Sequence, residues 1–252
     1  MIRLIPLDGI PEVRPGDDLA QLIAAAAGRG GVGLEDADVL VVTQKAVSKA
    51  EGRVVELASV QPGERAREWA DRWGKDARVV ELVLRESAEV LRMAEGGLII
   101  SRTRHGLVCA NAGVDVSNVG GGEAATLLPE DPDRSARELR ARIEELTGGH
   151  PAVVISDSFG RPWRLGIVNV AVGAAGLEPL LDLRGEADAQ GRAMRATVIA
   201  AADELASAAD LAGGKVEQRP AVVVRGYDYV PAGDDAPGAA ALVMPREQDL
   251  FP

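Results

Sequence analysis

The sequence is poor in cysteine, histidine and aromatic residues, and it carries no excess of positive charge. Its single cysteine, Cys109, excludes an intramolecular disulfide framework and fits a reducing cytoplasm. The net charge of -11 argues against non-specific binding to nucleic acid or to an anionic membrane surface. We therefore expect a cytoplasmic protein without nucleic-acid or membrane partners.

Long apolar runs are missing as well. Residues 1–6 lack the apolar core of a signal peptide. No uninterrupted apolar run reaches the length that spans a bilayer, because the alanine-rich stretches also contain Asp, Glu and Arg. The sequence shows no internal repeat and no low-complexity linker. Its 252 residues, 46% of them hydrophobic, predict a globular chain of one large domain or two closely packed ones.

Hydrophobic periodicity predicts strands and helices that alternate along the chain. Strands are predicted over residues 38–43, 98–101, 107–110, 153–156, 167–173 and 221–226. Helices are predicted from an Asp17 N-cap to about Gly28 or Gly30, and over residues 64–95, 133–147 and 193–212. The strands at 98–101 and 107–110 form an expected hairpin, in which Cys109 is predicted to be an inert core thiol.

The most informative stretch is residues 153–166. An apolar run rich in β-branched residues is predicted to end at Asp157 and Ser158, where the chain turns. A carboxylate and a hydroxyl at the end of a buried strand are suited to a hard cation. Arg161 and Arg164 follow, and guanidinium groups bind phosphate or carboxylate in bidentate fashion. The stretch suggests metal-assisted chemistry on a phosphorylated substrate, although a polar turn with two solvated arginines explains it more simply.

Two further polar segments lie close to predicted strands. Lys45 and Lys49 follow the strand at 38–43, as in a phosphate-handling loop, although the glycine-rich consensus is absent. A surface turn with solvated lysines is the alternative. Asp115 and Asn118 are three residues apart, so that a carboxylate and an amide could address one ligand. An Asx-turn without a ligand explains this second pair equally well.

Three segments are informative in combination: QKAVSKAEG at residues 44–52, ANAGVDVSN at 110–118 and SDSFGRPWR at 156–164. Taken together, they resemble the motifs of the coenzyme F-420-0:γ-glutamyl ligase family. The segments at 9–19 and 220–226 match the family too, so the resemblance covers nearly the whole chain in order.

The resemblance implies an enzyme that adds L-glutamate, through γ-linkages, to the deazaflavin coenzyme precursor F-420-0. GTP would be consumed through an acyl phosphate, with release of GDP and phosphate. Mg²⁺ or Mn²⁺ would be required, and a monovalent cation such as K⁺ is a further candidate. The implied fold is an unusual α+β arrangement of mixed sheets with flanking helices, assembled as an intertwined homodimer. Residues 1–252 would form one stand-alone unit, without the C-terminal flavin-dependent domain of some relatives.

The resemblance also implies roles for individual residues. Asp115, Asp157 and Ser158 would be metal ligands. Some relatives place an acidic ligand where this chain has Lys215, and Glu217 could take its place from two residues on. Asp157, Arg161 and Arg164 would serve catalysis. The nucleotide would contact Ile10, Pro11, Glu12, Val13, Gln44, Lys45, Lys49, Asn118, Gly213, Gly214 and Lys215.

Two other classes of protein fit the aspartates at strand ends. One is a metal-dependent phosphohydrolase that acts on a nucleotide or a phosphate ester. The other is a non-catalytic nucleotide-binding module. A requirement for glutamate in nucleotide turnover separates the ligase from the hydrolase, and any turnover separates it from the binding module.

Overall fold

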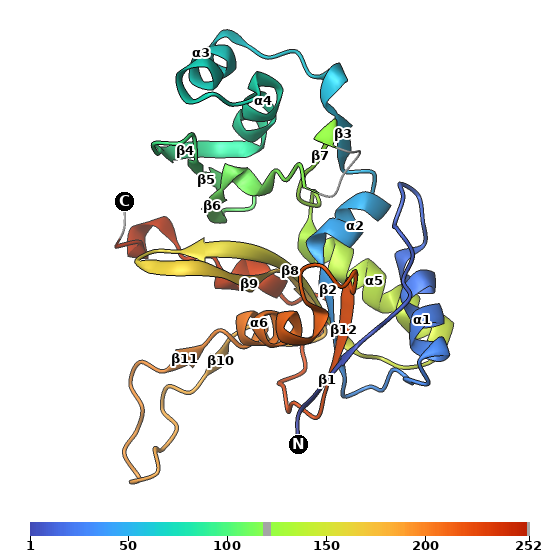
Figure 1. Ribbon diagram of the computed structural model, residues 1–252. Coiled ribbons are helices and arrows are strands. Elements are labelled where there is room, and N and C mark those ends of the chain that lie inside the picture. The colour runs from blue at the N-terminus through green and yellow to red at the C-terminus, as the bar shows by residue number, and fades with distance from the viewer. Residues whose placement is uncertain (118–121, 251–252) are drawn as a thin grey trace.

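The computed structural model describes residues 1–117 and 122–250, and it shows an α+β chain with several sheets (Figure 1). The helices are α1 (Leu19–Arg29), α2 (Gln44–Ala50), α3 (Glu64–Trp73), α4 (Ala77–Glu86), α5 (Pro132–Thr147) and α6 (Ala201–Gly213). The strands are β1 (Arg3–Pro6), β2 (Val39–Thr43), β3 (Val54–Glu56), β4 (Ser87–Met93), β5 (Ile99–Thr103), β6 (Val108–Ala110), β7 (Ala124–Thr126), β8 (Ala152–Arg161), β9 (Arg164–Ala175), β10 (Leu181–Asp182), β11 (Val198–Ile199) and β12 (Ala221–Arg225).

A five-stranded mixed sheet forms the centre of the molecule, with strand order β1-β12-β2-β8-β9. β2 and β8 are parallel, and the other neighbours are antiparallel. Both faces are covered, which explains why β2, β12 and residues 152–155 of β8 are nearly continuous apolar runs. Leu40 and Ile155 pack in the cluster that holds α1, α2 and α5, whereas Val41 and Val154 pack in the cluster that holds α6.

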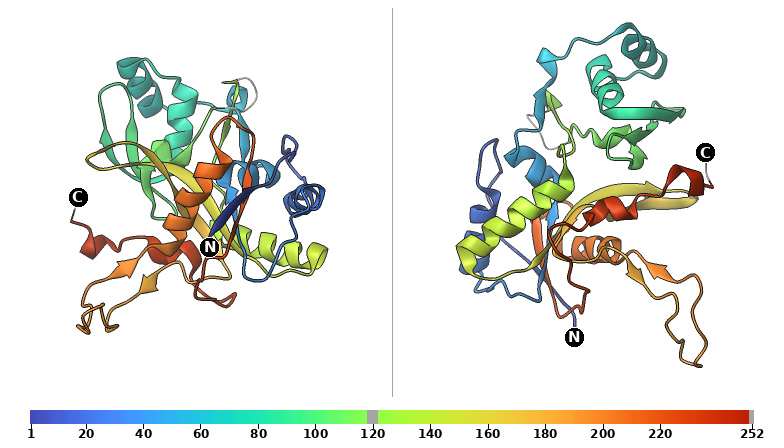
Figure 2. Two further views of the ribbon diagram at one scale, coloured as in Figure 1. Left: turned by 60° about the horizontal axis from the view of Figure 1, so that its bottom comes forward. Right: turned by 180° about the vertical axis from the view of Figure 1, so that it is seen from behind.

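A smaller lobe is built from residues between β3 and β7, which pair with each other at its base. It contains α3, α4 and the antiparallel sheet β4-β5-β6, and its own apolar cluster includes Leu57, Val83 and Ile99. Figure 2 shows this lobe beside the long β8–β9 hairpin. Ion pairs from Arg102 to Asp249 and from Arg246 to Glu89 join the end of the chain to the lobe.

The structure confirms the predicted strands and the helix at 133–147, but two predicted helices were too long. The predicted helix at 64–95 is α3 and α4 followed by β4, because residues from Ser87 onward pair with β5. The helix predicted at 193–212 begins at Ala201. The residues before it belong to an arm, closed by the β10–β11 pair, that extends from the body in Figure 1.

Three local predictions near the site were also wrong in detail. Asp18, not Asp17, caps α1, because its Oδ1 accepts the Gln21 N–H. The segment after β2 is the helix α2 and not a loop. β8 does not end at Asp157, because it continues to Arg161 in a hairpin with β9. Across the described residues, no helix is both long and apolar enough to cross a membrane.

Candidate functional site

A cavity of about 660 Å³ opens at one edge of the central sheet. The parallel pairing of β2 with β8 ends at Thr43 and Ser156, so Gln44 and Lys45 after β2 reach the same edge as Asp157 and Ser158 within β8. Residues 109–117, from the end of β6 onward, form another wall, and the segment at 214–220 between α6 and β12 closes it. Segments far apart in the sequence therefore meet in one place.

Most of the predicted site residues line this cavity. Gly213 is the last residue of α6 and lies just behind the lining, and Asn118 lies outside the described residues. The predicted residues that line the cavity are Ile10, Pro11, Glu12, Val13, Gln44, Lys45, Lys49, Asp115, Asp157, Ser158, Gly214 and Lys215.

Arg161, Arg164 and Glu217 are placed elsewhere. The two arginines face each other as the last pair of the β8–β9 hairpin, and Arg161 donates to the Leu165 carbonyl from its Nη2. Glu217 accepts the backbone N–H of Val216, and its carboxylate does not line the cavity. The structure therefore does not bring these three side chains to the carboxylates of the cavity.

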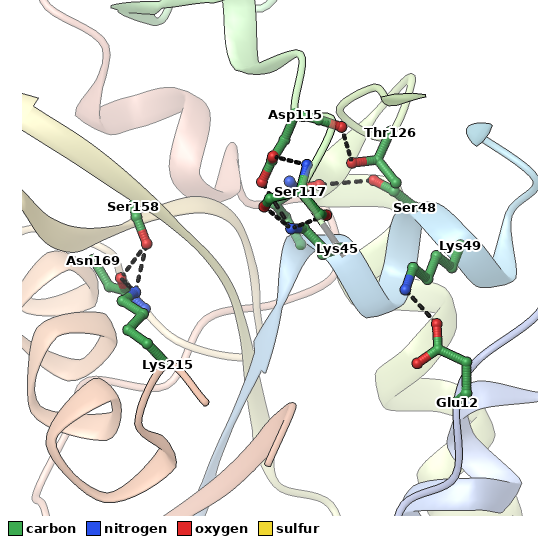
Figure 3. A network of polar contacts seen from close by, with 11 residues as sticks. Glu12, Lys45, Ser48, Lys49, Asp115, Ser117, Thr126, Ser158, Asn169 and Lys215 are labelled. Atoms are coloured by element: carbon green, nitrogen blue, oxygen red, sulfur yellow. Dashed lines mark hydrogen bonds and ion pairs between the residues drawn. The ribbon is translucent and has the colours of Figure 1, made fainter. Parts of the chain in front are cut away.

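Lys45 joins two sides of the cavity. Its Nζ lies 2.7 Å from Asp115 Oδ2, and it donates to the carbonyl and the hydroxyl of Ser117 at 2.9 and 3.0 Å (Figure 3). Burial opposes the charge of Asp115, but the Lys45 ammonium and the Ser117 hydrogen bonds outweigh it and lower the pKa of Asp115. Asp115 is therefore held ionised beside a fixed cation.

Asp157 has the opposite electrostatic environment. Burial raises its pKa to about 6, and the nearby Asp115 carboxylate acts in the same direction. The Ser158 backbone N–H and the cations Lys45 and Lys215 offset only part of this rise. Removal from water, reinforced by the Asp115 carboxylate, therefore outweighs the nearby cations and disfavours a negative charge on Asp157.

The second lysine of α2 is engaged with the segment after β1. Lys49 is almost fully buried and pairs with Glu12, whose side chain is exposed (Figure 3). Gln44, at the start of the same helix, accepts the Ser48 hydroxyl hydrogen at 2.8 Å. The Lys49–Glu12 pair therefore joins α2 to the wall formed by residues 10–13, whereas the Gln44–Ser48 contact lies within the helix.

Lys215 lies on the other side of Asp157, within a group of oxygen atoms. Its Nζ donates to Ser158 Oγ at 2.6 Å and to Asn169 Oδ1 at 2.9 Å, and it pairs with Asp210 at 3.0 Å. Sequence reasoning missed Asn169 and Asp210. The only local signal for Asn169 is one amide within the otherwise apolar run of β9. Other lining residues that were missed are Asn111, Ser117, Gln218 and Arg219.

The donor set suits Mg²⁺ or Mn²⁺. Asp115, Asp157 and Ser158 offer hard oxygen ligands to one cavity, and the raised pKa of Asp157 marks a place where added positive charge would be favourable. No group of three or more His, Cys, Asp or Glu side chains gathers for a metal within residues 1–117 and 122–250. A cation here would therefore need the hydroxyl, water or substrate oxygens in addition to the two carboxylates.

Comparison with known proteins places the chain among close relatives. A family model described as F420-0:Gamma-glutamyl ligase matches residues 9–226. A protein of Methanothermobacter thermautotrophicus named coenzyme F420:L-glutamate ligase is 47% identical over 251 residues, which are 99% of this chain and 98% of the relative. Proteins with the same name from Methanopyrus kandleri and Methanocaldococcus jannaschii are 45% and 42% identical, over 99% and 86% of this chain and 97% and 86% of the relatives.

Proposed function

The chain belongs to the F420-0:gamma-glutamyl ligase family, and on that basis we propose that it joins L-glutamate to the deazaflavin precursor F-420-0 through a γ-linkage. The reaction is the formation of a carbon–nitrogen bond in coenzyme F-420 biosynthesis. The observation that carries the proposal is the cavity itself, in which residues from all three resembling segments meet.

We propose that GTP activates the acid. A free carboxylate resists attack by an amine, because its leaving group would be oxide. Transfer of the γ-phosphoryl group to a carboxylate oxygen of the precursor forms an acyl phosphate and releases GDP. The amine of glutamate then attacks the acyl carbon, the C–O bond to phosphate breaks, and the amine gives up a proton as the amide forms.

The cavity residues support this chemistry mainly by position and charge. In the proposed complex, the Lys45 and Lys49 ammonium groups face the phosphates, and Gln44 and residues 10–13 form the wall on which the nucleotide lies. Lys45 has to exchange part of its contact with Asp115 for phosphate oxygens. Lys49, which pairs with Glu12, has less freedom to move.

A divalent cation, Mg²⁺ or Mn²⁺, would be held by Asp115, Asp157 and Ser158, and it would neutralise charge on the phosphate oxygens. The chain's own share is to keep Asp115 ionised and to place Asp157 beside it. A further requirement for a monovalent cation such as K⁺ is tested by carrying out the product analysis described below with and without K⁺.

We further propose that the protein acts as a homodimer. The tip of the β8–β9 hairpin exposes Trp163, Leu165 and Ile167, whose exposed fractions are 81%, 100% and 58%. An exposed apolar tip on a long hairpin is typical of a surface that packs against another chain. Arg161 and Arg164 lie at the same tip, so in this proposal they act at the interface between two copies and not in the cavity of one.

The test is a product analysis. The purified protein is incubated with F-420-0, L-glutamate, GTP and Mn²⁺, and the product is measured by mass spectrometry. The proposal predicts a mass increase of one or more glutamyl residues that requires glutamate, GTP and the divalent cation. Release of GDP without a glutamylated product would contradict it.

A further inference from the structure

Ser158, Asn169, Lys215 and Asp210 form a connected polar group beside Asp157. Figure 3 shows the first three together, with Ser158 on β8, Asn169 on β9 and Lys215 just after α6. Ser158 Oγ lies 2.8 Å from Asn169 Oδ1 and 2.6 Å from Lys215 Nζ. Asn169 is buried, with an exposed fraction of 4%, although its amide lies in a strand that is otherwise largely apolar.

Donor and acceptor chemistry determines how the hydrogen atoms are arranged in this group. An ammonium has only donors, so Ser158 Oγ and Asn169 Oδ1 must both accept from Lys215. Asn169 Oδ1 is then an oxygen and not a flipped amide nitrogen. Since it can only accept, the hydroxyl hydrogen of Ser158 has to point at it.

This arrangement leaves one free lone pair on Ser158 Oγ. A hydroxyl oxygen has two lone pairs and one hydrogen. Lys215 takes one lone pair, and the hydrogen is directed to Asn169. Ser158 lines the cavity beside Asp157, so toward the cavity its hydroxyl is an acceptor only.

We infer that Asn169 and Lys215 are positioning residues that hold the Ser158 hydroxyl as an oxygen ligand for the divalent cation, with Asp210 holding Lys215 in place. The inference rests on the proposed function, which supplies the need for that cation. A freely rotating serine would direct its hydrogen into the cavity for part of the time and would repel a cation there. Partners that orient metal ligands in this way are typically worth about 10- to 100-fold in metal affinity.

The chain offers a matched control at the same residue. Ser207 donates to the backbone carbonyl of Asn169 at 2.6 Å and not to its side-chain amide. Ser207→Ala removes a hydrogen bond to Asn169 without touching the Ser158 hydroxyl. It therefore reports the effect of loosening β9 alone.

The test measures Mn²⁺ binding in the absence of precursor, by calorimetry or by the spectrum of free Mn²⁺. Asn169→Leu, which is close in size, and Asn169→Val, which suits a strand, should each weaken Mn²⁺ binding about 10- to 100-fold. Asn169→Asp keeps an acceptor in place and should retain binding, as should Ser207→Ala. The double variant Ser158→Ala/Asn169→Leu should bind no more weakly than Ser158→Ala, because Asn169 acts through Ser158.

Unchanged Mn²⁺ affinity in both Asn169→Leu and Asn169→Val, or additive losses in the double variant, would overturn the inference. Circular dichroism and urea unfolding test whether each variant is folded. The comparison requires that Asn169→Leu or Asn169→Val, or both, is folded. The inference and the proposed function fail separately. Wild-type protein that binds Mn²⁺ with this dependence on Asn169 but forms no glutamylated product refutes only the ligase proposal.

Discussion

The Lys45 ammonium lies 2.7 Å from Oδ2 of Asp115. A lysine of α2, the helix directly after β2, therefore neutralises a carboxylate on the cavity wall formed by residues 109–117. The contact has two consequences. It keeps Asp115 ionised, and it places a cation on the lining of the cavity in which we propose that the nucleotide binds. Both consequences can be tested by removing the ammonium.

Lys45→Met should lower kcat/KM for GTP by roughly 10- to 150-fold, since hydrogen bonds to charged groups contribute about 1.5–3 kcal/mol. Steady-state GDP release at saturating precursor and glutamate measures the effect. Lys75→Met is the matched control, because Lys75 is exposed on the smaller lobe. Equal activity of the two variants would remove Lys45 from the proposed nucleotide site.

Metal binding should depend on pH through Asp157. The pKa of this carboxyl in the metal-free protein is raised to about 6, so below that pH a proton competes with the cation. The apparent Mn²⁺ affinity should fall about tenfold per pH unit below 6 and level off above it. Calorimetric titrations between pH 5 and pH 8 measure the profile, and a profile that is flat over this range would contradict the assignment of Asp157.

The Asp157 carboxyl should also make the stability of the metal-free protein depend on pH. Stability should fall as the pH rises, whereas Mn²⁺ affinity should increase. The pKa of this carboxyl in the folded protein is raised above the ordinary value of 3.8, so the folded state favours the protonated form. The stabilising contribution is present below about pH 4 and is lost as the pH rises through about 6. Without metal, Asp157→Asn should therefore be roughly 3 kcal/mol more stable than wild type at pH 8, at about 1.4 kcal/mol per pKa unit, and within roughly 0.5 kcal/mol of wild type at pH 4. Urea unfolding at the two pH values gives the comparison.

A buried ion pair at the opposite end of β2 should matter for folding and not for activity. Asp38 is 1% exposed, and its carboxylate accepts from Arg225 Nε and Nη2 and from the Glu35 backbone N–H. Asp38→Ala removes the buried carboxylate of this pair, but Arg225 keeps Glu35 as a second, exposed partner, so the change should cost about 1.5–3 kcal/mol of unfolding free energy. At a temperature where the variant is still folded, its kcat should match that of wild type, which separates this pair from the site.

Cys109 should be chemically inert in the folded protein. Burial raises the pKa of its thiol to about 12, and the nearby Asp157 carboxylate acts in the same direction. A thiol reagent at pH 8 should therefore react slowly with native protein and rapidly in urea. Fast labelling of the native state, at the rate of a free thiol, would show that the cavity wall around Cys109 opens.

The parts of the fold that were predictable are those in which local pattern and tertiary environment agree. β2, β12 and residues 152–155 of β8 are apolar on both faces because helices cover the central sheet on both sides, so their runs were recognisable. β4 was mistaken for helix because its residues pair with β5 through two register shifts, which interrupt the alternation of a regular strand. Irregular strand pairing of this kind cannot be predicted from the sequence of one short segment.

The site residues that could be predicted from the sequence are those that lie within short recognisable motifs. Asp115, Asp157, Lys45 and Lys49 stand in segments with recognisable chemistry, and they do line one cavity. Asn169 could not be found in this way, because its partner Lys215 lies 46 residues later and only folding brings the two side chains together. Arg161 and Arg164 were predicted to be site residues because they follow Asp157 and Ser158 closely in the sequence. The β8–β9 hairpin continues past Ser158, however, and places both arginines at its tip.

The most direct test of the ligase assignment is the glutamate dependence of GDP release, measured with wild type and Asp157→Asn side by side in Mn²⁺ and F-420-0. The proposed chemistry predicts that wild type releases GDP in step with glutamyl product when glutamate is present. It predicts that folded Asp157→Asn loses most of this turnover, since a metal contributes several kcal/mol of charge stabilisation. GDP release that is equally fast without glutamate, with no glutamylated product in either case, would instead identify a phosphohydrolase. Near wild-type turnover in Asp157→Asn would contradict the role of the carboxylate at the centre of the cavity.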